Sequence, residues 1–132
     1  MNDSFKASRD APIDVADVLA PLRHLENLEE ISLNNNGLVG RVPPLCSFAS
    51  FDRALEILSL AGNALSGAPT EDLGCLTSLR ALNLAGNRLD GQLPDAWRGM
   101  SNLEDLIVSD NERLGTIPAA WFDEDDTGDE RP

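Results

Sequence analysis

The sequence predicts an α/β solenoid with short parallel strands on its concave side, turns and short 3-10 or helical segments on its convex side, and an N-terminal capping helix. Three observations lead to this prediction. A segment of the pattern LxxLxLxxNxLxGxxP, in which another aliphatic residue can replace a leucine, recurs four times. Its asparagines are 27, 24 and 24 residues apart, a spacing typical of units that bury their apolar faces against one another. Hydrophobic residues make up 42% of the chain but aromatic residues only 5%, which suits a narrow stacked core.

The four copies run from Leu28 to Pro43, Leu55 to Pro69, Leu79 to Pro94 and Leu103 to Pro118. Their pattern resembles that of plant-type leucine-rich repeat proteins, LxxLxLxxNxLxGxIPxxLxxLxx, and the resemblance extends from about Leu22 to Trp121. The Pro-x-x-Trp and Met-x-x-Leu pieces resemble variants of algal and protist members. The resemblance implies a leucine-rich repeat solenoid and, for many relatives, an ectodomain that senses signals.

The chain departs from this pattern in three repeats. Repeat one has about three extra residues between Pro43 and Arg53, and repeat two is one residue short at Gly67-Ala68-Pro69. Repeat four has Arg113 where a buried leucine is expected, with Leu114 one place late. The cysteine pair that precedes the repeats in many plant receptor ectodomains is missing from this sequence.

The individual elements follow from the repeat. Residues 12–20 read as a short capping helix that begins near Pro12 and ends at Pro21, with an apolar face formed by Ile13, Val15, Val18, Leu19 and Leu22. Alternation predicts one inward-facing apolar pair in each of four strands, at 30–34, 57–61, 81–85 and 105–109. The connecting arcs are too short and too rich in Gly and Pro for long helices. The predicted organisation is a lead and capping helix at 1–21, a four-repeat solenoid at 22–122 and a disordered acidic tail at 123–132.

The repeated asparagine has a structural role in this interpretation. A buried amide side chain donates and accepts hydrogen bonds at once, so it can satisfy the backbone where the chain turns off the strand. At the same place in every coil it would tie neighbouring coils together. The predicted ladder consists of Asn36, Asn63, Asn87 and Asn111.

Charge and composition exclude several partners. The net charge of −13 repels phosphate backbones, which argues against nucleic acid and against anionic membrane surfaces. No run of about 18 apolar residues is present, so membrane insertion is not expected. The polar N-terminal residues do not form a secretory signal. This favours a cytoplasmic location, or an extracellular one if the chain is part of a longer protein.

No catalytic, cofactor or metal site is predicted. His24 is the only histidine, and no CxxC or phosphate-binding glycine motif is present. Cys46 lies three residues after Pro43 and Cys75 six after Pro69, so they are not at equivalent positions, and we expect two separate, half-buried thiols. The acidic tail begins like a calcium loop at Asp123 but ends before the loop is complete, and a solvated tail is the expectation.

The function predicted from these observations is non-catalytic binding of a protein or peptide partner. Strand residues that point outward on the concave face form three columns, in which Ile57 and Ile107 are apolar where solvent is expected. The alternative is a structural subunit, or a piece of a larger repeat protein or receptor-like ectodomain. The candidate binding residues, column by column, are Glu30, Ile57, Ala81 and Asp105; Ser32, Ser59, Asn83 and Ile107; and Asn34, Ala61, Ala85 and Ser109.

Overall fold

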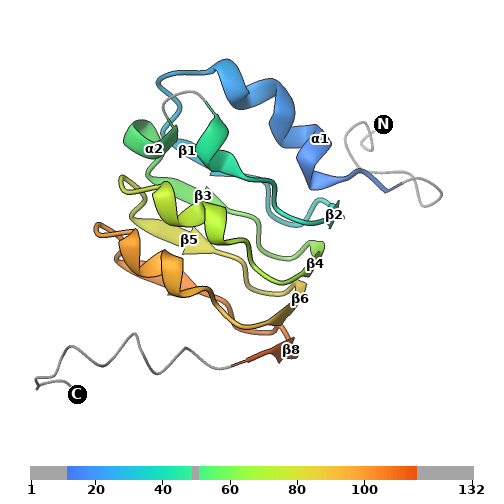
Figure 1. Ribbon diagram of the computed structural model, residues 1–132. Helices are drawn as coiled ribbons and strands as arrows, with labels where there is room; N and C mark the ends of the chain where they lie inside the picture. Colours follow the sequence, from blue (N-terminus) through green and yellow to red (C-terminus); the bar gives the residue numbers. More distant parts are fainter. Residues whose placement is uncertain (1–11, 49–50, 116–132) are drawn as a thin grey trace, which may run out of the picture.

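The structure is a computed structural model that describes residues 12–48 and 51–115. Four coils stack along one axis, with a strand of each coil on one side and short helical turns between successive strands on the other (Figure 1). A solenoid of short parallel strands with short convex helices is the predicted fold class, and it is confirmed. The predicted acidic tail at 123–132 and the calcium-like segment lie outside the described residues.

The concave sheet contains one strand from each coil. All neighbouring strands are parallel and lie in the order β1-β3-β5-β7. They are shorter than predicted because each runs for three residues before the chain turns. The strands are β1 (Glu30–Ser32), β3 (Ile57–Ser59), β5 (Ala81–Asn83) and β7 (Asp105–Ile107).

A second parallel sheet follows the asparagine turns, and the sequence pattern did not reveal it. Its strands are β2 (Val39–Gly40), β4 (Ala64–Gly67), β6 (Arg88–Gly91) and β8 (Arg113–Leu114). Strands of two to four residues, three of which end in glycine, are too short to show the alternation that identifies a strand. The glycine is required at Gly40, where φ is +93° and an added Cβ would collide with the carboxylate of Asp14.

Short helices form the convex side, as predicted. In the arcs between the concave strands these are η2 (Leu45–Ser47), α2 (Phe51–Ala54), η3 (Glu71–Cys75) and η4 (Asp95–Gly99), and α1 (Val15–Leu19) with η1 (Ala20–His24) precedes the first strand. The extra residues of repeat one supply α2, whose Phe51 is fully buried and meets Phe48 edge to face at 5.1 Å. Repeat one therefore uses its insertion to fill the core beneath its longer arc.

The capping helix differs from its prediction at both ends. Asp14 is the N-cap, and its Oδ1 accepts a hydrogen bond from Ala16 N at 2.8 Å, so the helix begins at Val15 rather than near Pro12. Pro21 does not end the helical segment but lies in the first turn of η1. The missing N–H of proline is harmless there, because first-turn amides have no partner within a helix.

The core is a column of leucine layers, one layer per coil. Leu58, Leu60 and Leu65 of coil two and Leu82 of coil three are fully buried. The inward residues of coil four, Leu106 and Val108, are only partly buried. Buried core residues therefore extend from coil one, where Leu38 and Leu45 are fully buried, through coil three, and the inward residues of coil four lie at the edge of this core.

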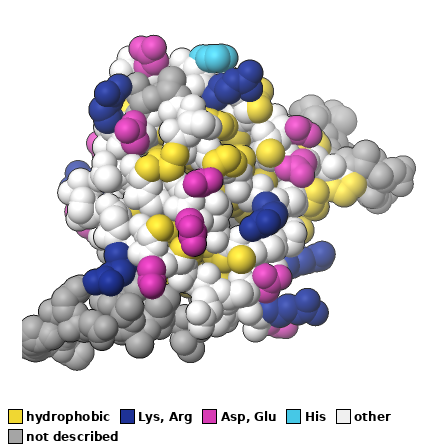
Figure 2. All heavy atoms as spheres, viewed as in Figure 1, with side chains coloured by type: hydrophobic (Ala, Val, Ile, Leu, Met, Phe, Trp, Pro, Cys, Tyr) yellow, Lys and Arg dark blue, Asp and Glu magenta, His cyan; other side chains and the backbone are white. Residues whose placement is uncertain are grey.

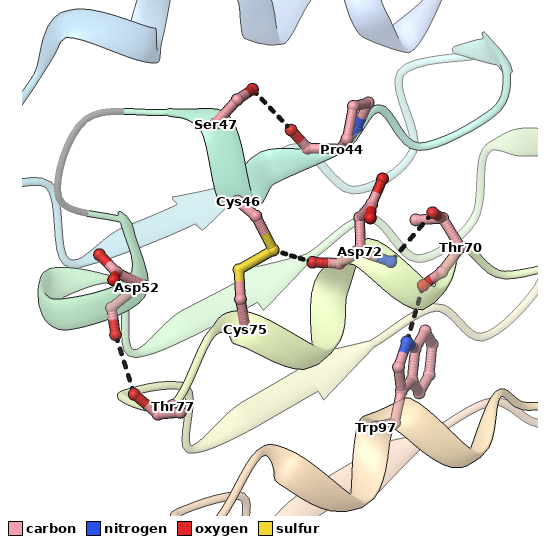
Figure 3. The surroundings of a disulfide bond; sticks show 9 residues. All are labelled: Pro44, Cys46, Ser47, Asp52, Thr70, Asp72, Cys75, Thr77 and Trp97. Carbon is pink, nitrogen blue, oxygen red and sulfur yellow. Dashed lines mark hydrogen bonds between the residues drawn. A yellow bond between two sulfur atoms is a disulfide. The ribbon is translucent and has the colours of Figure 1, made fainter.

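A disulfide joins Cys46 to Cys75, which corrects the prediction of two separate thiols (Figure 3). The bond links η2 to η3 across two neighbouring coils, with 5.8 Å between the Cα atoms. The prediction was wrong because it counted from the prolines, and the two arcs are out of phase. Leu45 enters the core two residues after Pro43, whereas Leu73 does so four residues after Pro69, and this difference brings the cysteines to facing positions.

The bridge lies among hydrogen bonds that also link successive arcs. The carbonyl oxygen of Asp72 contacts Cys46 Sγ (Figure 3). Thr77 Oγ1 donates to the carbonyl of Asp52 at 3.2 Å, and the indole N–H of the buried Trp97 donates to the carbonyl of Thr70 at 2.8 Å. The convex side is therefore held by both covalent and polar links.

We predict that replacing both Cys46 and Cys75 by serine lowers the free energy of unfolding by about 3 to 4 kcal/mol, because the bridge closes a loop with a sequence separation of 29. Urea unfolding of both proteins measures the difference. A reducing agent should destabilise the wild type to the level of the double variant and leave the variant unchanged. An equal effect of reductant on both proteins would contradict the assignment of the stabilisation to this bond.

Candidate protein-binding surface

The strand register brings the candidate binding residues together in columns. Glu30 pairs with Ile57, Ile57 with Ala81, and Ala81 with Asp105. The second column follows from the same pairing and contains Ser32, Ser59, Asn83 and Ile107. Backbone hydrogen bonds continue the ladder to the third column, Asn34, Ala61, Ala85 and Ser109. Whether this face binds a partner stays a prediction.

The two isoleucines are not equally accessible. Ile107 is 44% exposed, and only Leu25 at 45% equals it among the large hydrophobic side chains of the described residues. Ile57 is half-buried, because Glu30 and Ala81 flank it within the sheet. Ile107 is thus the apolar side chain that a partner can reach on this face.

A polar cluster fixes the centre of the face. Asn34 Oδ1 accepts hydrogen bonds from Ser59 Oγ at 2.7 Å and from Ala61 N at 2.9 Å, and its amide nitrogen donates to Ser32 Oγ at 3.4 Å. Asn83 Oδ1 accepts from Ala85 N at 3.1 Å. These asparagines therefore hold the shape of the face, a role that the outward pattern alone did not reveal.

Behind the face, three asparagine amides join successive coils. The side chain of Asn87 is 7% exposed, and its Oδ1 accepts from Leu65 N of the preceding coil at 3.0 Å. Its Nδ2 donates to the carbonyls of Leu60 and Leu84, both at 3.0 Å. Equivalent bonds surround Asn63, 9% exposed, and Asn111, 6% exposed.

Asn36 differs from the other three asparagines. It lies in the first coil, and its side chain is half-buried with one donated bond, to the carbonyl of Asn34 at 3.2 Å. The segment that packs before it is the capping helix and its lead-in rather than a coil, with Ile13 hydrogen-bonded to Val39. Asn36 occupies the repeat position, but its side chain does not link two coils.

The structure offers little for catalysis among its described residues. His24 is exposed at the end of η1, and no cluster of three or more metal-ligating side chains is found in the part of the chain that is described. A surface hollow of about 510 Å³ is lined mainly by polar and charged residues of coils three and four, including Arg88, Asp110 and Arg113. Within residues 12–48 and 51–115, no helix is long and apolar enough to cross a membrane.

Comparison with known proteins agrees with this architecture. The Leucine Rich Repeat family matches residues 27–49 and 78–100. No curated protein matches the sequence. Plant receptor ectodomains are among the solved structures with a similar architecture.

Three of these structures illustrate the similarity. The plant peptide hormone receptor RGFR1 in complex with RGF2 is 33% identical with a TM-score of 0.63, over 71% of this chain and 15% of the receptor. The Arabidopsis receptor kinase HAESA, in complex with the peptide hormone IDA and the co-receptor SERK1, is 32% identical with a TM-score of 0.65, over 77% and 17%. The Arabidopsis thaliana BIR3–SERK2 complex is 33% identical with a TM-score of 0.61, over 70% and 48%.

The repeat motif, the two parallel sheets and these similarities establish the class of protein. The chain is a leucine-rich repeat protein of the plant type. It spans 15%, 17% and 48% of the three chains to which it is compared.

We predict that Asn87→Ala lowers the free energy of unfolding by about 1–3 kcal/mol, because it leaves the buried Leu65 N–H without its side-chain acceptor. It also removes one of the two amide donors from each of the Leu60 and Leu84 carbonyls. Two asparagine variants serve as controls in the same urea titration. Asn36→Ala and Asn102→Ala should each cost far less, because Asn36 bridges no coils and the bond from Asn102 to the Thr77 carbonyl is exposed. Equal midpoints for all three variants would refute the role of the buried ladder.

Proposed function

We propose that this chain is a non-catalytic protein-interaction module whose concave sheet binds a protein or peptide partner. The observation that carries the proposal is the exposure of Ile107 at 44% on a sheet whose other outward residues are mostly small or polar. The exposed part of the Ile107 side chain adds nothing to the buried core, and an apolar side chain that a partner buries can carry much of the binding energy.

The rigidity of the face supports the same proposal. The hydrogen bonds of Asn34 and Asn83 fix the central side chains, and the buried asparagines hold the strands in register from behind. A surface that is already ordered loses little conformational freedom when a partner binds. Peptide-bound and co-receptor-bound structures among the similar receptors give the proposal a precedent in other proteins.

The disulfide bears on where such a module works. Disulfides persist in oxidising environments and are rare in the cytosol. The Cys46–Cys75 bridge therefore favours an extracellular or luminal location, against the cytoplasmic expectation drawn from the N-terminal residues. We include this location in the proposal.

The competing function is structural, as a subunit or as part of a larger repeat protein or receptor-like ectodomain. The partial burial of Leu106, Val108 and Leu114 in coil four favours it, since a further coil would cover such residues. Sedimentation of the chain as it exists separates the two functions. A monomer over a wide concentration range supports the self-contained module, whereas assembly supports the structural function.

We predict that Ile107→Asp weakens the binding of peptides selected from a random display library on the wild-type chain by at least about tenfold. Leu25→Asp is the matched control, because Leu25 is 45% exposed but lies outside the concave strands. Titration of each labelled peptide with the three proteins measures the dissociation constants. Both variants should melt close to the wild type.

The pattern of loss decides between the surfaces. Peptides lost with Ile107→Asp and kept with Leu25→Asp support the concave face. Peptides kept with Ile107→Asp would show that partners bind elsewhere on the molecule. Adding Ile57→Asp should strengthen the loss but also lower stability, because Ile57 is half-buried.

A further inference from the structure

We propose that the partner of the concave face is an extended basic segment with the pattern basic-x-apolar-x-basic, lying across the four strands. This inference rests on the proposed function and names the chemistry of its partner. It follows from the charges of the first column, from the spacing of the strands and from the position of the accessible apolar side chain.

The first column has a carboxylate at each end and apolar residues between them. Glu30 and Asp105 are the two exposed ends, and Ile57 and Ala81 lie in the middle. Neither carboxylate has an ion-pair partner among the described residues. Both carboxylates therefore present uncompensated negative charge beside a small apolar floor.

The residues that precede the strands strengthen this field. Backbone hydrogen bonds place Glu29 beside Glu56, Glu56 beside Arg80, and Arg80 beside Glu104. The single basic side chain of this row, Arg80, pairs with Glu104 at 3.2 Å, which leaves Glu29 and Glu56 to add to the negative potential. Elsewhere the charges are mixed: acidic and basic side chains are interspersed over the face shown in Figure 2. A basic segment is the complement of the concave edge, and charge complementarity steers and selects a partner.

Strand spacing sets the spacing of the basic residues. Neighbouring strands lie about 4.8 Å apart, so Glu30 and Asp105 are separated by three strand steps, about 14 Å. An extended segment rises about 3.3 Å per residue and points alternate side chains to one face, so its residues i and i+4 are about 13 Å apart on the same side. Basic residues at these two positions can meet both carboxylates.

The same spacing places the central residue of the segment. Residue i+2 lies about halfway between the two basic side chains, over Ile57 and Ala81, where an apolar side chain has apolar neighbours. Ile107 stands in the adjacent column on the same strand as Asp105, so it can contact the aliphatic stem or the backbone of the second basic residue. Three independent features of the face thus select one pattern.

A charge exchange between protein and peptide tests the proposal. The probe is the labelled peptide Ser-Lys-Ser-Leu-Ser-Lys-Ser, titrated with the wild-type chain and followed by fluorescence anisotropy. Its controls are Ser-Lys-Ser-Leu-Lys-Ser-Ser, which has the same composition but turns the second lysine to the other face, and Ser-Glu-Ser-Leu-Ser-Glu-Ser. We expect the first peptide to bind at least about tenfold more tightly than either control, and its affinity to fall as salt is added.

The protein variants carry the complementary exchange. The double variant Glu30→Lys with Asp105→Lys should bind the lysine peptide about tenfold or more weakly than the wild type does, and it should bind the glutamate peptide more tightly. Glu71→Lys with Asp95→Lys makes the same change of net charge on the convex helices and should leave the preference unchanged. If the concave variant keeps the lysine peptide, or the convex variant loses it equally, the proposal is wrong.

Two outcomes separate this inference from the proposed function. Library peptides that depend on Ile107 but carry no basic residues would overturn the basic pattern and leave the concave face as the binding surface. Self-association that Glu30→Lys with Asp105→Lys abolishes would show that a second copy, rather than a basic segment, occupies the face. That outcome would also overturn the inference.

Discussion

The hydrogen bonds of one buried amide per coil hold this molecule in register. At Asn63, Asn87 and Asn111 the side chain accepts from the backbone of the preceding coil and donates to carbonyls on both sides of the step. An aspartate could accept but not donate, and a leucine could do neither. Because the amides fix each coil against the last, the outward side chains of the strands fall into columns with a constant step. The candidate binding face is therefore a consequence of polar contacts in the interior.

Much of the fold could be predicted from the sequence because the repeated motif shows which residues of successive coils are equivalent. Once Leu58 and Leu82 are recognised as equivalent, the inward faces, the parallel register and the three columns follow. Elements without periodicity were harder to predict. The strands of the second sheet have two to four residues, and the insertion of repeat one produced α2 and the buried Phe51 without any repeated signal. Their positions depend on how neighbouring coils pack, which one repeat does not encode.

The candidate site shows the same division between pattern and packing. Alternation predicted which strand residues point outward, but it could not show that Asn34 is engaged by Ser59 or that Ile57 is less accessible than Ile107. The cysteine pair shows why counting residues from the repeat prolines gave a wrong prediction. Cys46 and Cys75 are unequal in distance from their prolines, yet they face each other, because the arcs enter the core at different points. Whether two residues of neighbouring coils face each other therefore depends on where each arc enters the core.

The position of the single disulfide makes the two ends of the solenoid unequal in how strongly their coils are held together. It ties the first coil to the second, whereas the third and fourth coils are held to their neighbours by leucine packing, asparagine amides and the Trp97 indole. Each unit of a solenoid is stabilised only by contacts with its immediate neighbours, so unfolding begins at the weakest interface between units and spreads stepwise. Coil four, with its half-buried Leu106 and Val108, is the less tightly packed end of the described coils, whereas the first two coils are held by the bridge. Ile107 and Asp105 lie on this less tightly packed coil, while Glu30 and Ile57 lie on the bridged coils. A ligand that spans the face would fasten the loose half of the molecule to the secure half.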